Sequence, residues 1–162
     1  NINRPHLNDE DLKQYLGLTY YLAGEYDKAL TTFLAAKDIT DENEEKFIMQ
    51  LNTMIASSQL KLGNIDIAKK EFLIVQNWFD KLDMSSYGQE EMFSYYVGYY
   101  LFQLNEYFGN NKEARIVLEK AYNTTNIPIL KKYLVFKKAN NHDKFELAIY
   151  FWVKDIADNY HK

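Results

Sequence analysis

The chain of 162 residues contains no cysteine, only two prolines and six glycines. Without cysteine there can be no disulfide, thiolate nucleophile or zinc–thiolate site, and this composition fits a reducing compartment, so a cytoplasmic location is expected. Both prolines, Pro5 and Pro128, lie near proposed helix starts, where a missing N–H does no harm. Apolar runs stay well short of the roughly 20 residues that a membrane-spanning helix needs, and no signal-peptide pattern opens the chain, so no membrane association is expected.

The chain has no excess of positive charge, because 23 acidic residues outnumber 19 lysines and arginines and the formal net charge is −4. Nucleic-acid binding through this chain is therefore disfavoured, since it depends on a broad basic surface. One basic cluster stands out, and it forms either a solvated helix face or a docking point for an acidic partner. Its members are Lys131, Lys132, Lys137 and Lys138.

Catalytic motifs are missing as well. His6, His142 and His161 stand alone, and the chain has no HExxH, no GxSxG and no phosphate-binding glycine loop. The acidic groups at residues 9–11 and 41–45 precede predicted helix starts, where negative charge complements the helix dipole. The sequence thus predicts no enzyme and no catalytic, metal-binding or cofactor-binding residue.

What the chain does contain is apolar residues at helical spacing, with 47% of all residues hydrophobic. Together with helix caps, this spacing predicts an all-α protein that forms one domain over residues 1–162. Because the chain begins with Asn1 rather than Met, we expect a processed product or a fragment of a longer protein. The predicted helices cover residues 8–23, 26–38, 41 or 42 to 62, 65–82, 85–108, 112–122, 126–138 and 143–160.

Small and aromatic residues recur along these helices at fixed offsets. Gly24, expected in the left-handed conformation that ends a helix, is followed five and nine residues later by Ala29 and Phe33. The same offsets return 39 residues later at Gly63, and 46 residues after that at Gly109, where Leu118 replaces the phenylalanine. A fourth pair of helices keeps the period without this signature. Since a single helical pair cannot bury its apolar face alone, such repetition predicts a stack of hairpins.

The first hairpin resembles the tetratricopeptide repeat (TPR) family. Its resemblance rests on six residues at that family's spacing: Leu16, Gly17, Tyr20, Ala29, Phe33 and Ala36. The resemblance implies antiparallel helical hairpins stacked as a right-handed TPR-like superhelix of about three to four repeats. It also implies that the first helix of each repeat lines a concave groove that receives partners. The chaperone-binding carboxylate clamp of the family is not expected, because Leu18 and Ser57 stand where asparagine would be needed.

Carrying the motif register over gives the partner-binding residues that the resemblance implies. They are Gln14, Leu18, Tyr21, Gln50, Thr53, Ser57, Lys61, Tyr96, Tyr99, Gln103 and Tyr107, with Leu22, Leu60 and Glu106 on the same helix faces. Amide groups could hold a peptide backbone, and tyrosine rings supply contact area at low entropic cost. Alternatively, several of these residues are merely solvated or belong to the core of irregular repeats.

Aromatic residues are abundant, with 14 tyrosines and 10 phenylalanines, and they crowd the helix predicted over residues 85–108. They can pack in the core, line the groove or form a stacking platform for single-stranded nucleic acid, and core packing is favoured.

Two functions fit this reading of the sequence. The first is a non-catalytic interaction module, without cofactors, whose groove binds a protein or peptide segment. The second is a regulatory domain that senses a signalling peptide, similar to the repeat domains of Gram-positive transcriptional regulators. A DNA-binding helix-turn-helix upstream would favour the sensor, and further repeats would favour the interaction module.

Overall fold

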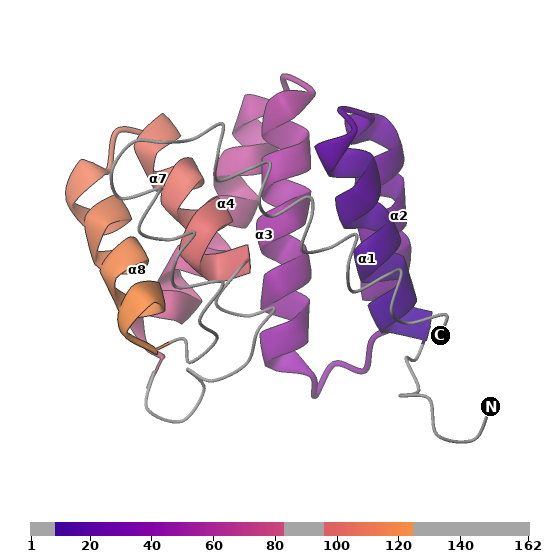
Figure 1. Cartoon of the computed structure of the whole chain (residues 1–162), viewed down its shortest axis with the longest axis horizontal. Coiled ribbons are helices and arrows are strands. Elements are labelled where there is room, and N and C mark those ends of the chain that lie inside the picture. The colour runs from indigo at the N-terminus through magenta and orange to yellow at the C-terminus, as the bar shows by residue number, and fades with distance from the viewer. Residues whose placement is uncertain (1–8, 83–95, 125–162) are drawn as a thin grey trace.

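The computed structural model describes residues 9–82 and 96–124, and every element in this part of the chain is helical (Figure 1). The all-α prediction is therefore confirmed for these residues. The predicted helices over residues 126–138 and 143–160, and with them the four lysines of the basic cluster, lie outside the described residues. The elements are α1 (Asp9–Leu22), α2 (Tyr26–Ile39), α3 (Glu45–Lys61), α4 (Ile65–Asp80), the π-helix η1 (Tyr96–Leu101), α7 (Phe102–Tyr107) and α8 (Asn111–Thr124).

Three helical hairpins are closed by the same glycine turn. Gly24, Gly63 and Gly109 have φ angles of 81°, 84° and 80°, which is the left-handed conformation expected of a glycine that ends a helix. In each turn the glycine N–H donates to the carbonyl three residues earlier, at 3.0, 3.1 and 3.2 Å. The next N–H donates to the carbonyl five residues before it, at 2.9, 2.9 and 2.8 Å. These two bonds form a Schellman motif, so the repeat read from the sequence corresponds to a repeated turn geometry.

The second helix of each hairpin begins directly after this turn. Ala29, Ala68 and Ala114 each donate their N–H to the carbonyl four residues earlier, which belongs to the residue that follows the glycine. All three alanines are buried. A small side chain is needed here because the two helices of the hairpin have just separated from the turn and still lie close together.

The helices pack in chain order. α1 lies on α2, α2 on α3, α3 on α4, and α3 also contacts η1, while α8 packs against both η1 and α7. Figure 1 shows the resulting row of hairpins, with α1 and α2 at one end and α8 at the other. α3 lies in the middle of the row and has neighbours on several sides, so residues 50–58 are all buried, polar residues included.

Within the first hairpin, the side chain that faces Gly17 is Phe33. A Cβ built on Gly17 would lie 2.7 Å from Cε1 and 2.8 Å from Cδ1 of the Phe33 ring. The two helices can therefore approach to this distance only because residue 17 has no side chain.

One predicted helix boundary was wrong. α3 begins at Glu45 rather than at residue 41 or 42, because the Asp41 side chain accepts the N–H of Asn43 at 2.8 Å and its carbonyl accepts the N–H of Glu44 at 2.9 Å. This local turn competes with the helix. In the third hairpin, the described part of the helix predicted over residues 85–108 is helical up to Tyr107, but residues 96–101 take the π-helical form η1 before α7 begins.

Candidate functional site

Most of the residues predicted to bind a partner are buried in the stack. Gln103 is half-buried, whereas Lys61 and Tyr107 are exposed, Tyr107 with 53% of its surface. The side chain of Tyr96 lies outside the described part of the structure. The buried members are Gln14, Leu18, Tyr21, Gln50, Thr53, Ser57 and Tyr99.

The buried polar members bond within the stack. Gln14 of α1 donates from Nε2 to Oε1 of Gln50 on α3 at 3.2 Å, so this amide pair joins the first two hairpins. Thr53 Oγ1 donates to the Met49 carbonyl at 2.8 Å, and Ser57 Oγ donates to the Thr53 carbonyl at 2.9 Å. These bonds satisfy groups that would otherwise be costly to bury.

A pocket of about 210 Å³ lies where the C-terminal parts of α1, α3 and α7 come together. All three are first helices of hairpins, which is the face that the TPR resemblance implied. We call it the three-hairpin pocket. The described residues that line it are Tyr21, Ser57, Leu60, Lys61, Gln103, Leu104, Glu106 and Tyr107. Five of them are predicted partner-binding residues, namely Tyr21, Ser57, Lys61, Gln103 and Tyr107.

The repeat offsets explain why these side chains meet. Tyr21, Leu60 and Glu106 occupy the same position of their hairpins, three residues before the turn glycine. Lys61 and Tyr107 likewise share the position one residue closer to that glycine. Because the hairpins stack side by side, equivalent positions on successive first helices become neighbours in space. Leu104 was absent from the predicted set. It is a buried core residue, and the helical spacing of one helix does not show which core residues also line a pocket between helices.

An aromatic cluster anchors the α1 side of the pocket. The Tyr21 ring packs edge-on against Tyr100 of η1, with ring centroids 5.3 Å apart, and against Tyr26 of α2 at 5.2 Å. Tyr99 and Tyr100 are both buried and have their centroids 4.8 Å apart. The sequence left three roles open for the aromatic residues, and for Tyr99 and Tyr100 the structure shows core packing. An arrangement of this kind holds its rings in fixed orientations.

Three of the polar side chains that line the pocket differ in chemistry, and the Ser57 hydroxyl and the Glu106 carboxylate line it as well. Lys61 is exposed, and its Nζ lies 5.9 Å from the centroid of the Tyr26 ring, a cation–π distance. Gln103 donates from Nε2 to the Tyr99 hydroxyl at 2.9 Å, which fixes the amide while its Oε1 can still accept a hydrogen bond. Tyr107 stands edge-on to Phe108, with centroids 5.1 Å apart. Beside its apolar walls, the pocket therefore offers a cation, an anion, a hydrogen-bond acceptor and an aromatic ring.

A second pocket, of about 310 Å³, has an acidic lining. Its described lining residues are Glu10, Asp11, Thr40, Asp41, Glu44 and Phe47. It lies between the first turn of α1 and the loop that leads into α3, where acidic residues complement the positive ends of the two helices.

Across residues 9–82 and 96–124, no group of three or more histidine, aspartate or glutamate side chains is arranged to hold a metal ion. His6, His142 and His161 lie outside these ranges. None of the helices in the same ranges combines the length and the apolar character needed to cross a membrane.

No protein-family model, no curated protein and no solved structure matches the chain.

Proposed function

We propose that this chain is a non-catalytic module that binds a protein or peptide segment along the first helices of a right-handed, TPR-like stack. One observation carries the proposal: a single pocket is built by equivalent positions of three successive hairpins. A segment lying across these helices would contact all three hairpins, so weak contacts can add along its length.

The size of the pocket favours a peptide side chain over a free metabolite. Small-molecule sites usually enclose about 300–1,000 Å³ and bury most of their ligand, whereas this pocket has about 210 Å³. Leu60 and Leu104 supply apolar walls for an inserted side chain. At the rim, Lys61 and Gln103 can bind a carboxylate, a backbone carbonyl or an N–H group of the same segment.

The test begins with a displayed library of random peptides selected on the immobilised protein. Affinity of a selected peptide is then measured for the double variant Lys61→Ala/Tyr107→Ala. Both side chains are exposed, so the fold should persist, and we expect at least about a tenfold loss of affinity. The matched control is Lys70→Ala/Leu73→Ala, which removes an exposed lysine and an exposed apolar side chain from the outer surface of α4.

The outcome that refutes the proposal is the reverse pattern. If the pocket variant retains affinity while the α4 variant loses it, the binding surface lies on the second helices. Circular dichroism of both variants checks that each remains helical.

Sensing of a signalling peptide is a second candidate, and η1 favours it. This π-helix precedes α7 directly. π-Helical turns are rare in proteins as a whole, but those that occur are often found at functional sites. Under this proposal, a peptide in the pocket shifts the third hairpin. Amide hydrogen exchange should then slow in residues 96–124 when the selected peptide binds. An unchanged exchange rate beyond the pocket residues would leave binding without a sensing response and refute this candidate.

A further inference from the structure

Three helices end at the three-hairpin pocket. Every described residue of its lining lies within the last five residues of α1, α3 or α7, which end at Leu22, Lys61 and Tyr107. The glycine turns satisfy some of the carbonyl groups at these ends. The C-terminus of a helix still carries a partial negative charge, and cations are favoured beside it. The negative ends of three helices therefore meet at one pocket.

The lining contains little positive charge to balance these helix ends. The last turns of α1 and α7 have no basic residue, and the last turn of α3 has only Lys61. The Lys61 Nζ lies 5.9 Å from the centroid of the Tyr26 ring, and Tyr26 is not among the described residues that line the pocket. The ammonium group is thus held at the α2 side of the pocket, where it can bind a carboxylate or a carbonyl of a bound segment.

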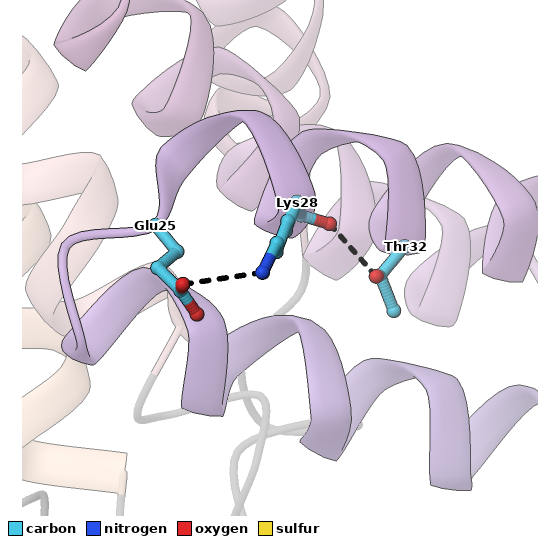
Figure 2. Close-up of polar contacts among 3 residues, drawn as sticks. All are labelled: Glu25, Lys28 and Thr32. Carbon is cyan, nitrogen blue, oxygen red and sulfur yellow. Dashed lines mark hydrogen bonds and ion pairs between the residues drawn. The ribbon is translucent and has the colours of Figure 1, made fainter.

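The lysine that follows the first turn is bound to another carboxylate. Lys28 donates from Nζ to Glu25 at 3.3 Å, and its backbone carbonyl accepts the Thr32 hydroxyl at 2.8 Å (Figure 2). Its Nζ also lies 5.8 Å from the centroid of the Tyr20 ring. None of these four residues is among the described lining of the pocket. Lys28 therefore adds no positive charge to that lining.

Three polar groups of the pocket present hydrogen-bond acceptors. Ser57 donates its only hydroxyl hydrogen to the Thr53 carbonyl at 2.9 Å, so its oxygen can only accept a bond from a ligand. Gln103 donates from Nε2 to the Tyr99 hydroxyl at 2.9 Å and keeps Oε1 as an acceptor. The exposed Glu106 carboxylate can accept several hydrogen bonds, so it can bind a ligand in addition to its neighbours in the protein. These acceptors match a ligand that is rich in donors.

We propose that the three-hairpin pocket receives a basic side chain, arginine in preference to lysine, of the segment that binds along the first helices. This inference rests on the proposed function and names the chemistry of its partner. The guanidinium supplies several N–H donors for Ser57, Gln103 and Glu106, and its charge complements the three helix ends. It is less strongly hydrated than an ammonium group and stacks on aromatic rings such as that of Tyr107. Its methylene groups lie against the apolar walls.

A neutral analogue of arginine tests the proposal. Peptides whose affinity falls in the variant Lys61→Ala/Tyr107→Ala should carry arginine or lysine at one fixed position. Replacing that arginine with citrulline keeps the shape of the side chain, removes its charge and should weaken binding at least about tenfold. Equal affinity for the two peptides overturns the proposal, and so do pocket-dependent peptides without a basic residue at a fixed position. The absence of any pocket-dependent peptide would instead refute the proposed function.

Substitution of Glu106 locates the bound cation. The Glu106 side chain is exposed, so Glu106→Gln should fold normally. In this variant the preference for arginine over citrulline should fall at least about threefold. The matched control is Glu119→Gln, which removes an exposed carboxylate from α8 and should leave the preference unchanged. A preference that Glu106→Gln does not change, or that both variants reduce equally, overturns the proposed site.

A free probe tests the pocket without any peptide. Millimolar N-acetylarginine methylamide should shift the backbone amide resonances of residues 57–61 and 103–107. The corresponding citrulline compound should leave them in place, because it lacks the positive charge. Equal shifts with the two compounds, or no shift with either, overturn the proposal.

Discussion

Replacing Gly17 with alanine tests the close approach of α1 and α2. A Cβ at this position would lie 2.7–3.0 Å from three carbon atoms of the Phe33 ring, which is closer than van der Waals contact. Phe33 is fully buried, so its ring has no solvent to move into. The added methyl group must therefore push the ring or the helices apart.

The free energy of unfolding reflects two opposing effects. Overpacking of a well-packed core typically costs about 1–3 kcal/mol. Alanine is favoured over glycine inside a helix by about 0.5–1 kcal/mol, which offsets part of that cost. The net expectation for Gly17→Ala is a loss of about 1–2 kcal/mol, because the steric effect is the larger. For a chain of this size, the melting temperature should fall by about 2–8 °C.

Denaturant and thermal melts of four proteins form the assay: wild type, Gly17→Ala, Phe33→Leu and the double variant. Phe33→Leu destabilises the protein on its own but removes the ring that meets the new methyl group. In that background Gly17→Ala should be neutral or stabilising, so the two effects should be strongly non-additive. A single variant Gly17→Ala as stable as wild type would refute the reasoning. So would an equal cost in both backgrounds.

Three further predictions use the same melts. Gly63→Ala should cost about 1–2 kcal/mol, because the residue has a φ of +84° with no atom within 4 Å of the new Cβ, so the cost is conformational alone; Gly63→Asn should cost less, and equal costs would contradict this cause. Ala29→Leu and Ala68→Leu should each lower stability by about 1–3 kcal/mol, since both alanines are fully buried, and an unchanged midpoint in both variants would contradict the assigned packing. Asn105→Ala should cost about 1–3 kcal/mol, because the buried Asn105 amide donates to Gln76 Oε1 at 2.7 Å and to the Leu101 carbonyl at 2.9 Å; Asn77→Ala, at an exposed site, should change the midpoint little.

The helices and their turns could be predicted from the sequence because both depend on local interactions. Apolar residues at helical spacing identified the four helices whose full predicted range is described, and α1 as far as it is described, to within a few residues at each end. The left-handed glycines could be located because positive φ is a property of a single residue and its neighbours, which glycine alone adopts without strain. The start of α3 was missed, although it too is local, because the Asx turn at Asp41 depends on how one side chain is oriented.

Tertiary structure alone decided which residues of the first helices are buried. Gln14 and Gln50 were expected to line a groove, yet they bond each other at a distance of 36 residues along the chain, a pairing that no local pattern contains. Helical spacing identifies the face on which a residue lies, but burial depends on which neighbour that face meets. Leu51 and Leu12 occupy the same position in their hairpins, but Leu51 is fully buried and Leu12 is 46% exposed, because within residues 9–82 and 96–124 a preceding helix, α2, packs on α3 and none packs on α1.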